Sequence, residues 1–267
     1  HGFDASGKPT AEIGIDGEPT CLAVGGPDHA FPGRIYVGAG RTVRVLDFDG
    51  KPVDAWEIPG EKVLLTSMAA AANDVFVADF ANRGVLRYDT SGELLGRIGQ
   101  PDKDRKIAGF ILPSPFFDLA VAADDVLWVV NPGLRRLEAY TFDGGLELFW
   151  GESSTGVEGF FGCCNPAHFA LLPDGRFVTA EKGLLRVKVY TAAGQFDGVV
   201  AGPEQLDTRA GPRPAPTAEG RFDYELKAVD VAADSQGRVL ILDPARRTVR
   251  IFQPKPPVSE PSDEPST

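Results

Sequence analysis

Residues 230–252 read DVAADSQGRVLILDPARRTVRIF, and this stretch decides the fold because the chain repeats it. Two other segments have the same length and layout, DLAVAADDVLWVVNPGLRRLEAY at 118–140 and HFALLPDGRFVTAEKGLLRVKVY at 168–190. Each reads as a short strand, a turn with Asp or Gly, a second apolar strand, a polar bend, and a third strand that ends in an aromatic residue. Residues 67–88 and 21–46 carry two looser copies of the same layout.

A second recurring element follows the third strand, and YDTSGELLGRIG at 88–99 is an example. Its glycine supplies the backbone freedom that a tight hairpin turn needs. Equivalent positions recur in steps of 42 to 62 residues. Four short strands in a repeat of this size are typical of a β-propeller blade. The sequence therefore predicts an all-β protein, a single β-propeller over residues 1–253 with four-stranded blades. We count five blades, or six if an N-terminal blade has been trimmed away.

The two ends of the repeat region complement each other. FDASGKPTAEIG at 3–14 matches only the fourth-strand element, whereas the last repeat stops after its third strand at Phe252. We therefore expect the N-terminal strand to pair with the last blade and close the ring, which would remove exposed strand edges. Residues 254–267 are rich in Pro, Ser and acidic residues, and we expect them to form a disordered tail.

The repeat motif resembles that of the NHL-repeat family of β-propellers. Residues 230–252 are the clearest match and 75–99 the next, and the likeness extends at repeat level over nearly all of residues 3–253. NHL-type propellers commonly have six blades and serve many roles, so the resemblance implies a fold more than a function. Because NHL-like propellers include a zinc-dependent lyase and related rings include calcium-dependent lactone hydrolases, it also implies a metal-dependent enzyme as an alternative.

Charge and hydropathy exclude some partners. The net charge of -11 and the pI near 4.8 argue against nucleic acid, since a phosphate-binding face would have to form against the protein's own field. No apolar run reaches the ~18 residues of a membrane span. The chain opens at His1 without a methionine, and we expect a mature, monomeric protein that is secreted or periplasmic.

The repeat alignment predicts which residues lie together. In a propeller, the first strand of each blade lines the central channel, so the residues that begin the five inner strands should surround one mouth of it. These residues are Cys21, Ser67, Asp118, His168 and Asp230. Cys163 and Cys164, in FGCCNPAH at 161–168, lie in the loop that leads to His168. We predict a ligand-binding site from these seven residues together with Glu181, which Lys182 follows directly.

The cysteines leave three interpretations open. Cys163 or Cys164 with His168, and Cys21 as a further ligand, could bind a transition metal such as Zn, Cu or Fe. Alternatively, Cys163 and Cys164 could form a vicinal disulfide, a flat platform beneath a ligand. In the third interpretation they are small buried residues that pack a loop.

The acidic residues also have two interpretations. Asp118 and Asp230 could be a carboxylate pair for a cation or for acid–base chemistry, or they could accept hydrogen bonds from neighbouring backbone. A polar residue recurs at the end of the second strand of four repeats, which indicates a structural role in accepting backbone N–H groups. These residues are Asp79, Asn131, Glu181 and Asp243.

The sequence thus predicts an NHL-like β-propeller that acts as a binding module, with a metal or small-ligand site at the channel mouth. A metal-dependent lyase or hydrolase that uses the same site is the alternative, although the residues identify no catalytic group. A second alternative is a protein-interaction platform without a small-ligand site. The expected partner is accordingly a small ligand or a protein at the channel mouth.

Overall fold

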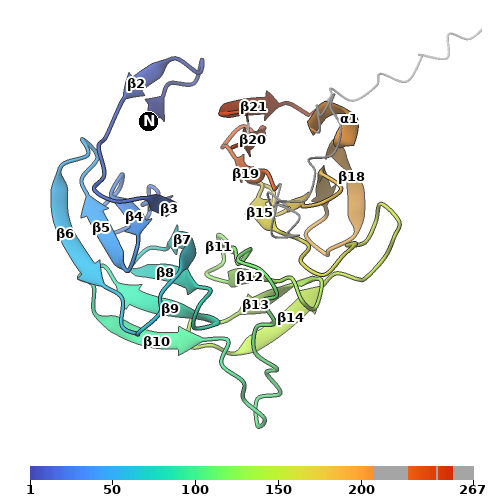
Figure 1. The fold of residues 1–267 in the computed structure, drawn as a ribbon, viewed down its shortest axis with the longest axis horizontal. Helices are drawn as coiled ribbons and strands as arrows, with labels where there is room; N and C mark the ends of the chain where they lie inside the picture. Colours follow the sequence, from blue (N-terminus) through green and yellow to red (C-terminus); the bar gives the residue numbers. More distant parts are fainter. Residues whose placement is uncertain (207–227, 245, 255–267) are drawn as a thin grey trace, which may run out of the picture.

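The computed structural model describes residues 1–206, 228–244 and 246–254, and it forms a five-bladed β-propeller (Figure 1). The predicted tail therefore lies almost entirely outside the described residues. Each blade is an antiparallel sheet whose strands follow chain order from the centre outward. The first blade contains β3 (Pro19–Val24), β4 (Ile35–Ala39), β5 (Thr42–Leu46) and β6 (Pro52–Glu57). The second contains β7 (Leu65–Ala70), β8 (Asp74–Asp79), β9 (Gly84–Asp89) and β10 (Leu94–Ile98).

The remaining blades continue the ring in the same order. The third blade contains β11 (Leu119–Val121), β12 (Leu127–Asn131), β13 (Arg136–Tyr140) and β14 (Leu146–Trp150). The fourth contains β15 (His168–Leu171), β16 (Phe177–Glu181), β17 (Arg186–Tyr190) and β18 (Phe196–Ala201), and a short helix follows, α1 (Pro203–Leu206). The fifth contains β19 (Asp230–Ala233), β20 (Val239–Asp243) and β21 (Thr248–Phe252). No helix among the described residues is long and apolar enough to cross a membrane.

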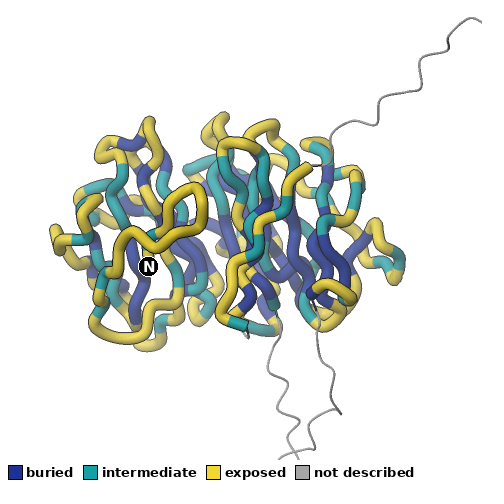
Figure 2. Tube along the Cα trace, turned by 90° about the horizontal axis from the view of Figure 1, so that it is seen from above, coloured by how far each residue is buried: buried dark blue, intermediate teal, exposed yellow. Residues whose placement is uncertain are grey.

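Burial explains the hydropathy pattern of the strands. Every residue of β8, β12 and β16 is buried, because neighbouring blades cover both faces of a middle strand (Figure 2). Their inner residues are therefore mainly apolar, and each strand ends in a polar residue. The outermost strands β6, β10 and β14 are largely exposed.

The hairpin between third and fourth strands depends on glycine, as the repeats predict. Gly50, Gly92, Gly144 and Gly194 all have a positive φ, between 76° and 89°. L-residues adopt this backbone region only at a cost. These four glycines thus let the outer strand turn back on its blade.

The predicted ring closure is not made among the described residues. The N-terminal residues form their own hairpin, in which β1 (Gly2–Phe3) pairs with β2 (Pro9–Ala11), and the fifth blade ends at β21 with three strands. The Asp4 carboxylate caps the hairpin turn by accepting hydrogen bonds from the backbone N–H groups of Ser6 and Lys8. A short hairpin closes at a lower entropic cost than pairing with a strand at the other end of the chain. The local pairing thus competes with the predicted pairing of residues 3–14 with the last blade.

Candidate functional site

Asp118 lies where three blades meet at the central channel. Its Oδ1 accepts hydrogen bonds from Ser67 Oγ at 2.5 Å and from the Leu119 N–H at 2.9 Å. Its Oδ2 accepts one from the Phe169 N–H, also at 2.9 Å. Ser67, Asp118 and Phe169 belong to the second, third and fourth blades. The carboxylate therefore connects three blades at the starts of their inner strands.

His168 lies between two carboxylates. Its Nδ1 is 3.5 Å from Asp118 Oδ2 and 3.5 Å from Asp230 Oδ1. Burial lowers the pKa of His168, but the hydrogen bond to Asp118 and the negative charges of Asp230 and Asp118 outweigh it and raise the pKa to about 9. At neutral pH the imidazole is therefore protonated. Partial desolvation by the surrounding channel and the negative charge of Asp118 raise the pKa of Asp230, although half of its side chain reaches solvent, and the His168 cation opposes that rise.

This arrangement predicts a pH-dependent stability. The folded-state pKa of His168 is near 9, and the usual value is 6.5. A raised pKa adds stability that is complete below pH 6.5 and is lost as the pH rises through 9. We expect thermal melting in chelator to show a stability advantage of wild type over His168→Gln that shrinks across this window. At 1.36 kcal/mol per pKa unit, the advantage is at most about 3 kcal/mol. A difference that stays constant from pH 6 to pH 10 would contradict the raised pKa.

Asp118, His168 and Asp230 could hold a metal ion. Among the described residues they are the one group of three or more His, Cys, Asp or Glu side chains whose ligand atoms lie within 4.8 Å of one another. Two ligands of a tetrahedral ion at 2.0–2.1 Å are separated by roughly 3.4 Å, which matches the two 3.5 Å distances at His168. The Asp230 side chain is 53% exposed, so the group is open to solvent on that side.

Cys21 lies near this group but does not join it. Burial raises the pKa of its thiol to about 11, and the nearby Asp118 charge adds to the effect. Cys21 is therefore a neutral thiol at physiological pH, a poor metal ligand in that form.

Cys163 and Cys164 form a separate pair in the loop before β15. Their Sγ atoms are 3.2 Å apart, and none of the three cysteines is in a disulfide. The cysteines and His168 are not brought together as one set of metal ligands; His168 instead faces the two aspartates. The structure thus divides the predicted site into a channel group, defined as Asp118, His168 and Asp230, and a cysteine pair.

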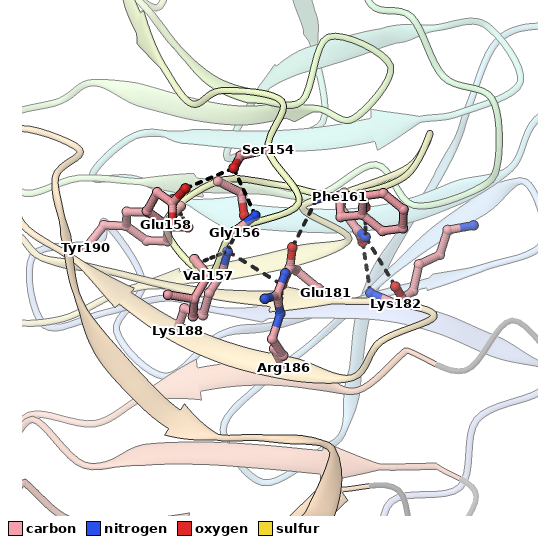
Figure 3. Close-up of polar contacts among 12 residues, drawn as sticks. Ser154, Gly156, Val157, Glu158, Phe161, Glu181, Lys182, Arg186, Lys188 and Tyr190 are labelled. Carbon is pink, nitrogen blue, oxygen red and sulfur yellow. Dashed lines mark hydrogen bonds and ion pairs between the residues drawn. The ribbon is translucent and has the colours of Figure 1, made fainter.

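Glu181 is buried inside the fourth blade, where it meets two cations (Figure 3). Its Oε2 lies 2.6 Å from Arg186 Nε and 3.5 Å from Lys188 Nζ. Its Oε1 accepts a 3.4 Å hydrogen bond from the Phe161 N–H of the preceding loop. Both carboxylate oxygens are thus engaged within the protein.

The polar residue at the end of the second strand has the same structural role in two other blades. Asp79 accepts a hydrogen bond from the Leu64 N–H, and Asn131 accepts one from the Ile111 N–H. In each case the donor lies in the loop that precedes the blade. In the second, third and fourth blades the end of the second strand thus anchors the preceding loop. Asp243 differs, since its described partners are Arg246 and Arg250 of its own blade.

Lys188 is an important residue that the sequence reasoning missed. It is fully buried, and its Nζ donates hydrogen bonds to the carbonyl oxygens of Gly159 at 2.7 Å and Val157 at 3.1 Å. Burial lowers its pKa to about 8, although Glu181 opposes the shift. The available signal was a lysine in RVKVY, in the third strand of a blade, where both faces are covered.

Comparisons with known proteins support the fold. No protein-family model matches this sequence, and no curated protein sequence matches it either. Among solved structures, the chain is similar to virginiamycin B lyase from Staphylococcus aureus, with 11% identity and a TM-score of 0.54 over 91% of this chain and 72% of that one.

Two further structural neighbours have comparable similarity. Glutaminyl cyclase from Myxococcus xanthus has 11% identity and a TM-score of 0.52, over 88% of this chain and 98% of that one. Hydrazine synthase from Kuenenia stuttgartiensis has 13% identity and a TM-score of 0.56, over 94% and 80%. At such identities function does not transfer with the fold. The comparisons therefore establish a β-propeller, and nothing narrower.

Proposed function

We propose that this propeller is a binding module that holds a divalent metal ion in its central channel, with Asp118, His168 and Asp230 as ligands. The observation that carries the proposal is that one imidazole nitrogen lies 3.5 Å from each of two carboxylate oxygens. The resemblance of the repeats to NHL propellers is consistent with a ligand at the channel.

The donor set favours particular ions. One nitrogen and two carboxylate oxygens suit borderline to hard divalent cations such as Zn²⁺, Fe²⁺ or Mn²⁺. Two carboxylates and a neutral imidazole also compensate the charge of a divalent ion. Since His168 is protonated at neutral pH without a metal, binding must displace that proton, and the affinity should rise with pH.

The surroundings orient the ligands in advance. Asp118 is held by Ser67 and by two backbone N–H groups, so its carboxylate loses little freedom on binding. The Phe116 ring stands edge-on to His168 with ring centroids 5.6 Å apart, which restricts the imidazole. Three protein ligands leave at least one coordination position for a small ligand that enters from the exposed Asp230 side.

The test is metal content and affinity of protein purified without chelators. We expect about one zinc, iron or manganese ion per chain. Asp230→Asn should weaken the metal affinity by about 100-fold or more. Loss of a residue that only hydrogen-bonds to a metal ligand already costs about 10–100-fold, and Asp230 is a proposed ligand itself. Asp49→Asn is the matched control, since Asp49 is an exposed turn residue paired with Lys51. Wild-type protein that stays metal-free when titrated with all three ions would contradict the proposal.

An enzyme is the second candidate, because three ligands with an open position are typical of catalytic rather than structural metal sites. A bound divalent ion would supply Lewis acidity for a lyase or hydrolase reaction. Asp230, as the most exposed ligand, would face the substrate. Turnover of ester or lactone substrates that is lost in chelator and restored by one metal would favour this candidate over a pure binding module.

A further inference from the structure

The loop before β15 presents two adjacent thiols in unequal settings. Cys163 is exposed to solvent, whereas Cys164 is buried with 2% of its surface accessible. Their Sγ atoms are 3.2 Å apart, close enough for one thiol to hydrogen-bond to the other sulfur. A disulfide bond of about 2.05 Å would need them to approach by only about 1.2 Å.

The loop is held firmly in this arrangement. Asn165 Nδ2 donates hydrogen bonds to the Phe161 and Lys182 carbonyl oxygens, and Asn165 Oδ1 accepts one from the Lys182 N–H. Arg135 Nε donates to the Gly162 carbonyl oxygen at 2.9 Å. These contacts tie the loop to the third blade and to the bend after β16. The two sulfur atoms are thus preorganised rather than brought together by chance.

A cation and a hydroxyl group surround the inner sulfur. Lys182 Nζ lies 3.4 Å from Ser114 Oγ, and both groups act to lower the pKa of Cys164. Burial raises the pKa of Cys164, but hydrogen bonds from Ser114 and Cys163 and the Lys182 charge outweigh it, so the pKa falls below its usual value. The pKa of Cys163 is raised because its thiol donates to Cys164 and senses that charge. An electropositive setting of this kind is typical of reactive rather than inert cysteines.

We propose that Cys163 and Cys164 are a redox-active pair that exchanges with small-molecule disulfides and closes reversibly to a vicinal disulfide. Cys163 is the contact sulfur, because it alone reaches solvent. Cys164 is the base and then the resolving sulfur, because it lies beside both Cys163 and Lys182. The proposal does not depend on a metal in the channel, since it uses none of the channel group.

The chemistry balances in two steps. The reaction starts from the pair with a single proton, in which Cys163 is the thiol and Cys164 is the thiolate. Cys163 Sγ passes its proton to the Cys164 sulfur and attacks the disulfide RSSR, which forms a mixed disulfide and releases RS⁻. Cys164 then attacks Cys163 Sγ, the new S–S bond forms, and the second RS group leaves with the proton as RSH. Two electrons pass from the cysteine pair to RSSR, which ends as RSH and RS⁻. Excess thiol reverses the sequence.

The test uses the reduced chain, treated with oxidised glutathione and analysed by intact mass. We expect wild type to lose two hydrogen atoms in mass and to carry no glutathionyl group. Alkylation after denaturation should then label only Cys21, and peptide mapping should find the 163–164 link. Wild type that keeps three alkylatable thiols, or that accumulates the mixed disulfide, would overturn the proposal.

Single substitutions separate the roles of the two sulfur atoms. Cys164→Ser should stop at the mixed disulfide and gain one glutathionyl group on Cys163. Cys163→Ser should react little, because its remaining sulfur in the pair is buried. Cys21→Ser is the control and should still lose two hydrogen atoms. Closure that persists in either Cys163→Ser or Cys164→Ser would show that another thiol forms the bond and would contradict the assignment.

The closure rate tests the role of Lys182, because a purely structural role would leave this rate unchanged in a stable variant. Lys182→Gln removes the charge beside Cys164, and we expect the closure rate at neutral pH to fall by about tenfold. Lys51→Gln, a change at an exposed turn lysine, should leave the rate unchanged. Equal rates in the two variants at matched thermal stability would contradict the role of Lys182.

Discussion

Asp118→Ala is expected to lower the free energy of unfolding by about 3–5 kcal/mol. The carboxylate accepts hydrogen bonds from Ser67 Oγ and from the Leu119 and Phe169 N–H groups, and it faces the His168 cation. Its removal leaves the buried Phe169 N–H without a partner, at about 1–3 kcal/mol, and leaves the Leu119 N–H with only a longer 3.3 Å hydrogen bond to Ser67 Oγ. It also leaves the His168 cation without its buried counter-ion, which adds to the loss. Urea denaturation in the presence of a chelator measures the effect without any contribution from bound metal.

Two variants calibrate this result. Asp124→Ala changes an exposed turn residue of the same blade and should cost less than about 0.5 kcal/mol. Ser67→Ala removes one of the hydrogen bonds and should cost about 1–2 kcal/mol. If Asp118→Ala proved no more harmful than Ser67→Ala, the carboxylate would not be the junction of three blades that its contacts indicate.

Glu181→Ala is expected to destabilise the protein by a similar 3–5 kcal/mol, for a different reason. Glu181 is the common partner of Arg186 and of Lys188, and the Lys188 side chain is wholly buried. Truncation leaves two cations close together in a weakly solvated environment, which is the costly way to break a buried ion pair. It also removes the acceptor of the Phe161 N–H, so the loop that carries the cysteine pair loses an anchor. Chemical denaturation of the variant measures the cost.

A double variant shows whether the loss of stability in Glu181→Ala comes from the unpaired charges. Glu181→Leu combined with Lys188→Met removes the negative charge and the deepest positive charge together. We expect the double variant to be more stable than the sum of the two single losses by at least about 1 kcal/mol, because the single changes share one interaction. Glu147→Ala, at an exposed site on β14, is the matched control. Strictly additive losses would mean that Glu181 and Lys188 are not coupled.

Phe116 and Lys182 lie between the channel group and the cysteine pair and connect them. The Phe116 ring stands edge-on to His168, and Lys182 Nζ lies 5.0 Å from the centroid of the same ring. The Lys182 charge in turn lowers the pKa of Cys164. Metal titrations should therefore be made with the cysteines in a defined oxidation state.

The repeats alone determined a β-propeller of four-stranded blades, because each blade is a local unit whose strand pattern and turn glycines are written in consecutive residues. They left five or six blades open, and the structure has five. Repeat alignment also predicted that Ser67, Asp118, His168 and Asp230 begin inner strands, and hydrogen bonds and ion pairs link these residues around the channel. Equivalent positions in a repeat become neighbours around an axis, so this part of the site needed no tertiary information.

The tertiary structure decided what those residues contact. The repeats suggested that residues 3–14 complete the last blade, but a local hairpin competes for the same strand. They also could not show that Lys188 pairs with Glu181, or that Lys182 and Ser114 come together and lower the pKa of Cys164. Ser114 belongs to a loop between two blades and lies far from Cys164 in sequence, and such loops do not repeat. The path of each of these loops depends on packing between blades. Only the tertiary structure therefore shows which charged groups lie beside the buried side chains.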